Sequence, residues 1–323
     1  MTAATTKQVA KAREPDGRAE GTAAGRVRRR LTSRTATISA IIIAMVWTTP
    51  TFGLFVSSFR PENEIKTSGW WTFFSAPHLT LENYNEVLFG TSSSSGRLAS
   101  YFVNSIVITI PAVLFPIAFA AFASYALAWI NFKGRNWIYI GIFALQIVPL
   151  QMALVPLQRF FSTGVSVAGV SILPSWDTDY VGRFSTVWFA HTCFALPVAV
   201  FLLHNFMSQL PRDLMEAARV DGAGHAAIFR KIVLPLIAPA LASIGIFQFL
   251  WVWNDLLVGL IFAGGGEKAA PLTVRLADLA GTRGNEWQRL TSGAFISMVI
   301  PLIVFLSLQR YFVRGLLAGS VKG

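Results

Sequence analysis

Six long apolar segments dominate this chain and limit what it can fold into. An α-helix rises 1.5 Å per residue, so about 20 apolar residues cross the roughly 30 Å hydrocarbon core of a bilayer. Only 13% of the 323 residues are charged, about half the usual share of a soluble domain. The sequence therefore predicts an all-α, polytopic membrane protein with six transmembrane helices. They lie near residues 37–59, 102–130, 137–157, 185–207, 236–263 and 291–312.

The basic residues lie unevenly around these segments. Of the 27 Lys and Arg residues, 18 lie in the N-terminal tail, in loops 131–136 and 208–235, and near the C-terminus. Cytoplasmic loops carry the excess of Lys and Arg, so both termini are expected in the cytoplasm. Topology and contact with anionic membrane lipid account for the net charge of +11, and nucleic acid is not an expected partner.

Composition divides the chain into two parts. Residues 1–35 have almost no large apolar side chain and predict a disordered, basic cytoplasmic tail. Residues 36–323 form the six-helix transmembrane domain. Between the first two segments, Trp70, Trp71, Phe73 and Phe74 predict an interfacial aromatic belt or a short helix on the membrane surface.

Catalytic and metal-binding patterns are missing from the sequence. It contains no G-x-x-x-x-G-K-[ST] phosphate loop and no G-x-S-x-G nucleophile elbow. Its one cysteine, Cys193, excludes an intrachain disulfide, and the nearby His191 is two residues away, on another face of a helix. We therefore expect no enzymatic activity, no catalytic residue, no metal site and no cofactor bound by this chain.

A polar stretch, residues 211–235, interrupts the apolar pattern. Gly222-Ala-Gly-His-Ala-Ala227 matches a G-x-G-x-x-A dinucleotide fingerprint, but that fingerprint requires a preceding strand. Here Pro211–Val220 predicts a helix, with Pro211 at its first position and Gly222 as a left-handed cap. A second short helix follows and is expected to end at Pro235.

Two short helices of this kind need a surface to dock on, because isolated helices of about ten residues are unstable in water. The small side chains permit close approach, and Phe229 offers one bulky anchor. The stretch is therefore either a projection that fits a partner's groove or an ordinary loop folded back on its own bundle. Local chemistry leaves both readings open.

The residues of this stretch resemble the EAA loop of ABC importer permeases. The segments FVNSIVIT, SYALAWINFKGR, FALPVAVFLLHNF, FLWVWNDLL and RYFVRGLLAGSVKG resemble the carbohydrate-type members, in particular the maltose-type second membrane subunit. The overall outline resembles the α-glucoside branch. The loop residues that carry the resemblance are Glu216-Ala217-Ala218, Asp221-Gly222-Ala223, Phe229, Ile232, Leu234-Pro235 and Pro239.

The resemblance implies a type I ABC importer permease in the bacterial inner membrane, importing sugars such as di- or oligosaccharides or α-glucosides. It implies a companion permease in a heterodimer, a dimeric cytoplasmic ABC ATPase that binds ATP and Mg, and an extracytoplasmic sugar-binding protein. The loop would be the coupling helix held by the ATPase. The implied coupling residues are Glu216, Ala217, Ala218, Asp221, Gly222, Ala223 and Phe229.

A carboxylate in the fifth apolar segment marks a possible translocation path. Placing Asp255 at the bilayer centre costs roughly 3 kcal/mol, so such a residue usually faces a pathway or a partner. Beside it, Trp253 can stack on a sugar ring and Asn254 can bond to hydroxyl groups. The alternative is that this W-N-D stretch packs against the companion subunit or stabilises a helix bend. Gln146 and Gln151, on either side of Pro149, are further lining candidates.

Two other function classes stay open. A secondary transporter would be expected to show inverted repeats and more ionisable residues within the membrane. A membrane scaffold would use loop 211–235 to dock a partner other than an ATPase. The EAA pattern argues against both.

Overall fold

The computed structural model describes residues 34–90, 97–167, 169–176, 180–281 and 285–318. The expected disordered tail, residues 1–35, lies almost entirely outside them. The chain divides into two units, Met1–Val56 and Ser57–Gly323. The first contains most of helix α2 (Arg34–Ser58), on which Ile41, Val46 and Trp47 lie exposed on different faces. A helix that is apolar on all sides suits a lipid environment.

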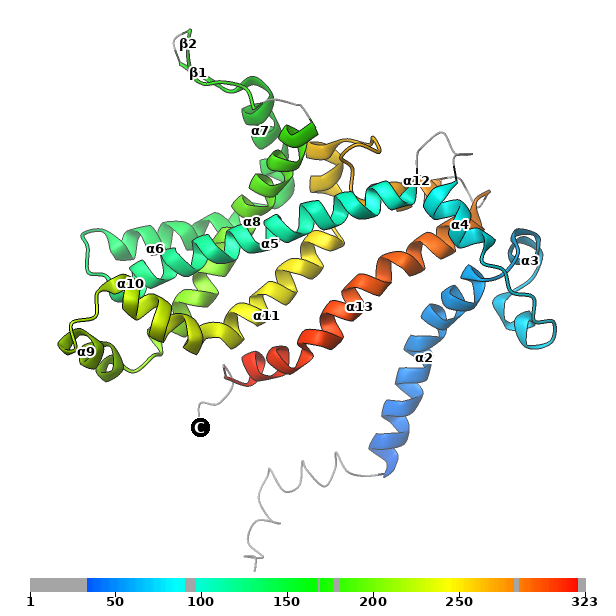
Figure 1. Ribbon diagram of the computed structural model, residues 1–323, viewed down its shortest axis with the longest axis horizontal. Coiled ribbons are helices and arrows are strands. Elements are labelled where there is room, and N and C mark those ends of the chain that lie inside the picture. The colour runs from blue at the N-terminus through cyan, green and yellow to red at the C-terminus, as the bar shows by residue number, and fades with distance from the viewer. Residues whose placement is uncertain (1–33, 91–96, 168, 177–179, 282–284, 319–323) are drawn as a thin grey trace, which may run out of the picture. The chain divides into compact units, whose positions relative to one another are not determined.

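The second unit is a helical bundle with small elements at both ends (Figure 1). Its long helices are α5 (Leu98–Trp129), α8 (Tyr180–Ser208), α11 (Leu234–Trp253) and α13 (Trp287–Ala318). The remaining elements are α3 (Glu62–Thr67), η2 (Trp70–Phe74), α4 (Glu82–Phe89), α6 (Arg135–Ala144), η3 (Leu145–Ile147), α7 (Leu150–Thr163), β1 (Val165–Val167), β2 (Val170–Leu173), α9 (Arg212–Val220), α10 (His225–Ile228), η4 (Phe229–Val233), η5 (Gly259–Ala263) and α12 (Leu272–Gly281).

Five of the six predicted spans contain a helix that is long and apolar enough to cross a membrane, and in the fifth this helix ends at Trp253. The third is not straight, because α6 with η3 and α7 meet at an angle of 104°. Proline disfavours helical geometry at the residue before it, and Val148, which precedes Pro149, is extended with φ −72° and ψ 116°. The helical fold class is confirmed, and the third segment is sharply bent at Pro149.

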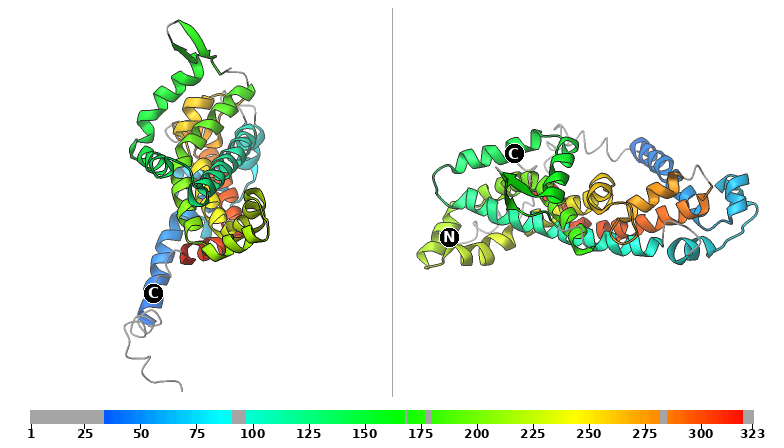
Figure 2. Two further views of the ribbon diagram at one scale, coloured as in Figure 1. Left: turned by 90° about the vertical axis from the view of Figure 1, so that its left-hand side faces the viewer. Right: turned by 90° about the horizontal axis from the view of Figure 1, so that it is seen from above.

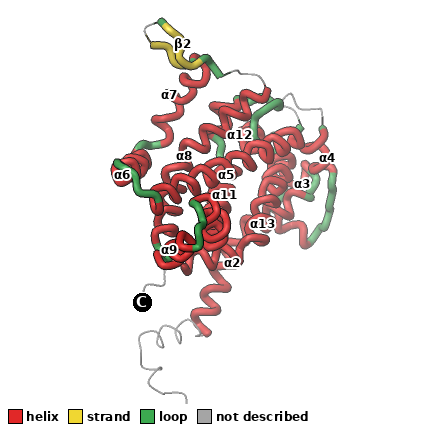
Figure 3. The backbone as a smooth tube through the Cα atoms, turned by 60° about the vertical axis from the view of Figure 1, so that its left-hand side comes forward, coloured by secondary structure: helices red, strands yellow, loops and turns green. Residues whose placement is uncertain are grey.

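A two-stranded antiparallel hairpin adds β structure to a fold predicted as all-α. Strands β1 and β2 pair Val165 with Leu173 and Val167 with Val170. The V-S-V and V-S-I pattern alternates β-branched and small polar residues, which favours a strand. Figure 3 shows the hairpin as the yellow segment that extends beyond α7.

Small residues allow α5 and α8 to pack closely along their length, as the views in Figure 2 also show. Ala120 and Ala121 of α5 and Ala199 of α8 are buried in one cluster. Without large side chains between them, two helix backbones approach closely, which is the usual basis of helix association in lipid. In the same contact Ser124 Oγ donates a hydrogen bond of 3.0 Å to the carbonyl of Val200.

Prolines inside these helices create further contacts between them. A proline has no N–H, so the carbonyl four residues earlier loses its helical partner. Pro116 frees the carbonyl of Ala112, which accepts a bond of 3.2 Å from Gln248 Nε2 of α11. Likewise Pro111 frees the carbonyl of Val107, and Trp188 Nε1 of α8 donates to it at 3.0 Å. The prolines therefore connect α5 to both neighbouring helices.

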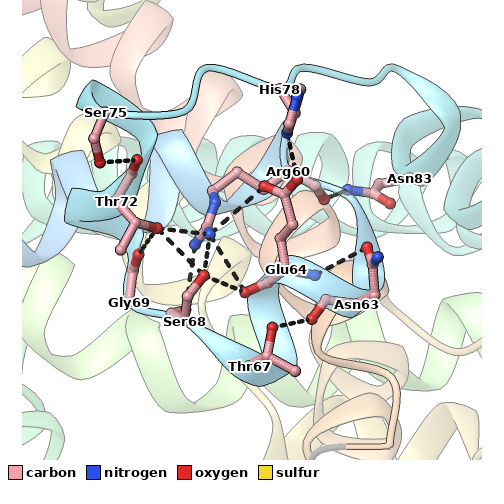
Figure 4. A network of polar contacts seen from close by, with 10 residues as sticks. All are labelled: Arg60, Asn63, Glu64, Thr67, Ser68, Gly69, Thr72, Ser75, His78 and Asn83. Carbon is pink, nitrogen blue, oxygen red and sulfur yellow. Dashed lines mark hydrogen bonds and ion pairs between the residues drawn. The ribbon is translucent and has the colours of Figure 1, made fainter.

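A buried arginine organises the segment before α4 (Figure 4). Arg60 is only 2% exposed, and its guanidinium donates to the carbonyls of Glu64 and Ser68, to Ser68 Oγ at 2.6 Å and to Thr72 Oγ1 at 3.1 Å. Asn83 Nδ2 of α4 then donates to the carbonyl of Arg60 at 2.8 Å. These bonds hold α3, η2 and α4 together, and Trp70–Phe74 forms a short 3₁₀ helix, which is one of the two alternatives predicted for it.

The loop before α12 is fastened to the start of α5. Ser100 Oγ donates to Glu267 Oε1 at 2.7 Å, and this bond lowers the pKa of the Glu267 carboxyl. Asn104 Nδ2 donates to the carbonyls of Glu267 at 2.8 Å and Ala270 at 3.1 Å. The start of α5 thus contacts this loop and α4, whereas the end of α5 contacts α9 and α10.

Candidate functional site

The polar stretch forms the predicted helix, glycine turn and helix. Helix α9 begins at Arg212, one residue after Pro211, and ends at Val220. Gly222 has φ +80°, the left-handed geometry that glycine adopts without steric cost. The turn is closed by Gly222 N–H to the carbonyl of Arg219 at 3.0 Å and by Ala223 N–H to the carbonyl of Ala218 at 2.9 Å.

Helix α9 has one face in the protein and one face in solvent. Met215 and Ala218, three residues apart, are 3% and 8% exposed and belong to the core cluster between α5, α8 and α11. Glu216 and Ala217 are exposed, and Val220 is 88% exposed. The face of α9 opposite Met215 and Ala218 is therefore open to solvent and available to a partner.

Three contacts fix the loop to the end of α5. Arg219 Nη2 donates to the carbonyl of Trp129 at 3.3 Å, and the Tyr125 hydroxyl lies 3.0 Å from His225 Nδ1. Phe229 packs on Tyr125 with ring centroids 5.2 Å apart. These contacts join α9 and the turn that follows it to the end of α5.

Two predicted coupling residues thus contact this chain's own core. Ala218 holds α9 to the bundle, and Phe229, expected as an anchor toward a partner, lies against Phe122 and Tyr125. The second helix also does not end at Pro235, because the helix runs from His225 to Trp253. Its turn Phe229–Val233 is a π turn, and this wider turn accommodates the proline ring. Asp221 and Ala223 lie in the exposed turn itself.

Trp253 lies inside the bundle, away from any open surface. It is 4% exposed, and its ring packs on Phe249 and edge-on to Phe102. Its Nε1–H donates at 3.0 Å to the carbonyl of Ser297, the group freed by Pro301 in α13. This geometry favours the packing alternative for Trp253 over the stacking of a sugar ring.

Replacing Trp253 with Phe removes that hydrogen bond and retains an aromatic ring. We expect the free energy of unfolding to fall by about 1–2 kcal/mol, because the carbonyl of Ser297 is left unsatisfied. Thermal unfolding of the purified protein in detergent measures the effect. Trp251→Phe is the matched control, since Trp251 is partly exposed and has no hydrogen-bond partner among the described residues; an equal loss in both variants would contradict the assignment.

Asp255 caps a break in the fifth predicted span. Helix α11 ends at Trp253, and the chain resumes helical geometry before η5. Asp255 Oδ2 accepts a bond of 3.0 Å from Gly259 N–H, and the Asp255 carbonyl accepts one of 2.5 Å from Thr273 Oγ1. Buried His191 of α8 places Nε2 3.8 Å from the same carboxylate. Asp255 therefore stabilises a helix break, in agreement with the helix-bend alternative for this stretch.

The other lining candidates, Gln146, Gln151 and Asn254, do not share one surface. Gln146 lines a groove of about 690 Å³ between the α6–α7 bend and α8, together with Phe194 and Trp251. Gln151 is exposed in the first turn of α7 but does not line this groove. Asn254 is exposed and donates from Nδ2 to the carbonyl of Leu250 at 2.7 Å. The structure thus brings Gln146 to a mostly apolar groove and leaves Gln151 and the W-N-D stretch outside it.

Several residues important to this arrangement carry no sequence signal of their own. Tyr125, Trp129 and Arg219 fasten the loop, and His191 lies beside Asp255, yet each reads locally as an ordinary helix residue. Their roles arise from segments about 60 to 100 residues apart in the chain. In the described residues, no group of three or more His, Cys, Asp or Glu side chains could hold a metal ion.

A family model and several relatives match this chain. Residues 87–317 match the model described as binding-protein-dependent transport system inner membrane component. The osmoprotective compounds uptake permease protein GgtD of Synechocystis is 48% identical over 289 residues, covering 88% of this chain and 91% of that protein. The alpha-glucoside transport system permease protein AglG of Rhizobium meliloti is 38% identical, covering 88% of this chain and 96% of its own length.

A solved structure shares the fold. A chain of a bacterial ABC transporter for import of the acidic polysaccharide alginate superposes with a TM-score of 0.66 at 19% identity, covering 90% of this chain and 98% of that chain. A chain of a bacterial alginate ABC transporter, solved in complex with an alginate pentasaccharide-bound periplasmic protein, matches with a TM-score of 0.62 at 14% identity. At these identities the likeness concerns the fold.

Proposed function

Because this chain belongs to the family of binding-protein-dependent transport system inner membrane components, we propose that it is one membrane subunit of an ATP-driven sugar importer. The observation that carries the proposal is the exposed face of α9, presented by a loop fastened to α5. This face lies within the 231 residues, 87–317, that match the family. The family consists of transport permeases. In the importer, this chain forms half of the translocation path and changes conformation during transport.

The substrate class follows from the relatives. AglG is named for alpha-glucosides, and a 31% identical relative from Thermococcus litoralis is named for trehalose and maltose. We therefore assign di- and oligosaccharides, with α-glucosides the first to test. The more similar GgtD is named for osmoprotective compounds, so small osmoprotective glycosides form the second set of substrates for the same assay.

Coupling uses the outer face of α9. Glu216 and Ala217 would contact a cytoplasmic ATPase subunit, with Asp221, Gly222 and Ala223 shaping the turn, while Ala218 and Phe229 hold the loop to this chain. ATP, with Mg, would bind to the dimeric ATPase. When that dimer closes, it would displace α9, and the contacts to Tyr125 and Trp129 would carry the displacement to α5. Transport then follows from two states that make different contacts.

The distribution of Lys and Arg supports an orientation with α9 and both termini in the cytoplasm of a bacterial inner membrane. A companion permease would supply the other half of the path, and an extracytoplasmic binding protein would deliver the sugar. Gln146, in its groove, and the exposed Asn254 are the residues we assign to the path first, followed by Gln151 and Asp255. Trp253 is assigned to packing.

Glu216→Lys tests the proposal. Glu216 is exposed and has no hydrogen-bond or ion-pair partner among the described residues, so the change leaves the fold intact and reverses a charge on the docking face. We expect uptake of labelled α-glucoside by cells to fall about tenfold, the effect of a loss of about 1.4 kcal/mol in association. Membrane levels should stay normal.

Asp278→Lys is the matched control, because it makes the same change of charge at an exposed position in α12, away from α9. Normal uptake in both variants would overturn the role of α9. Uptake that persists in cells without an ATPase partner would instead favour a secondary transporter, and a chain that supports no uptake of any solute would favour a scaffold.

A further inference from the structure

A cavity of about 420 Å³ opens beside the α9 loop, where the end of α5, the start of α6 and the end of α8 meet. Two arginines line it, and no Asp or Glu does so among the described residues. A cavity of this charge favours an anionic occupant. Its polar lining residues are Trp129, Arg135, Asn136, Tyr139, His204, Ser208 and Arg212.

One buried donor at this cavity has no acceptor in the described part of the chain, the Nε1–H of Trp129. His204 also lines the cavity, and its ring bonds to the backbone of Leu127. An indole N–H can only donate, and leaving it unsatisfied in the interior costs free energy. Arg135 directs Nη1 to Asn131 Oδ1 at 3.2 Å and to the carbonyl of Ile130, whereas Arg212 is exposed and has no ion-pair partner among the described residues. An occupant with several acceptor oxygens would satisfy these groups.

The surface next to the cavity is apolar. Helix α6 leaves it with exposed Trp137, Ile140 and Phe143. A second hollow shares Arg135 and Asn136 with the first and adds Lys133 and Trp137. Cationic donors beside an apolar helix match a molecule with a charged headgroup and hydrocarbon chains. Soluble phosphate would make no contact with the apolar surface of α6. Basic pockets between membrane helices on the cytoplasmic side bind such headgroups.

We propose that this cavity binds the headgroup phosphate of an anionic phospholipid, with its acyl chains along α6. The phosphate oxygens accept from Arg135, Arg212 and the Trp129 indole. The inference rests on the proposed function for its orientation, which places the cavity at the cytoplasmic leaflet. The backbone carbonyl of Trp129 accepts the hydrogen bond from Arg219 of α9. The lipid would therefore lie where the coupling loop meets α5.

The test measures binding of fluorescent phosphatidylglycerol to the full-length chain, purified with its companion permease in a neutral detergent. We expect Arg135→Gln with Arg212→Gln to weaken binding about tenfold or more, as each cation contributes severalfold. Trp129→Phe, which removes the donor and keeps a ring, should weaken it severalfold. Lys231→Gln, a cation on the same loop that does not line the cavity, is the matched control and should bind as the parent does.

Competition identifies the occupant. Phosphatidylcholine and inorganic phosphate should displace the probe poorly; effective displacement by inorganic phosphate would assign the cavity to a free anion and overturn the lipid. Unchanged lipid binding in the double variant would also overturn the proposal. The same holds if the double variant still binds the lipid but no longer binds the ATPase. The lipid-binding assay needs neither ATP nor sugar. Its result therefore does not depend on whether Glu216→Lys impairs uptake.

Discussion

Gly222→Pro is expected to abolish uptake while the protein still inserts in the membrane. Proline requires φ near −65°, whereas Gly222 has φ +80° and donates its N–H to the carbonyl of Arg219. The substitution therefore breaks the turn between α9 and α10 and displaces the exposed face of α9. Uptake of labelled sugar, membrane level by immunoblot and co-purification of the ATPase measure the effect, and uptake and co-purification should both fall about tenfold or more.

Gly224→Ala is the matched control two residues away. Gly224 has ordinary extended geometry with φ −74°, and a Cβ there would meet no atom within 4 Å. We expect near-normal uptake from it, and an intermediate loss from Gly222→Ala, because a left-handed alanine is strained by about 1 kcal/mol. If Gly222→Pro transports normally, the assignment of this loop to the ATPase joint fails.

Arg60→Ala is expected to release the segment between Ser57 and α4. Its buried guanidinium donates to four oxygens, which belong to Glu64 of α3, to Ser68 directly after α3 and to Thr72 of η2 (Figure 4). Removing one member of a buried charged network costs about 3–5 kcal/mol, because the remaining groups lose their partners. Limited proteolysis should cut within residues 60–90, and thermal unfolding in detergent should start at a lower temperature.

Two further variants separate charge from geometry. Arg60→Lys keeps the charge but not the planar fork of donors, so it should recover only part of the stability. Lys66→Ala breaks the exposed pair with Glu62 in α3, and such surface pairs contribute at most about 1 kcal/mol. If Lys66→Ala lowers stability as much as Arg60→Ala, the buried network is not what holds this segment.

Much of the fold and of the coupling loop follows from local sequence. Five spans and the order of polar loops were predicted from apolar length, since lipid requires every backbone group to be bonded within the helix. The helix and left-handed turn at Gly222 were predicted as well, because proline and glycine restrict the backbone whatever surrounds them. For the W-N-D stretch the sequence left a translocation path, subunit packing and a helix bend open, and the structure shows a helix break capped by Asp255.

The sequence by itself thus determined the membrane class, the number of apolar segments and the shape of the loop. Only the tertiary structure decided which face of α9 is free and where Phe229 and Trp253 lie. It also paired the carbonyls freed by Pro111, Pro116 and Pro301 with donors from other helices. The physical reason is that backbone restriction and hydrophobicity act over a few residues, whereas these contacts join helices whose pairing depends on how whole surfaces fit.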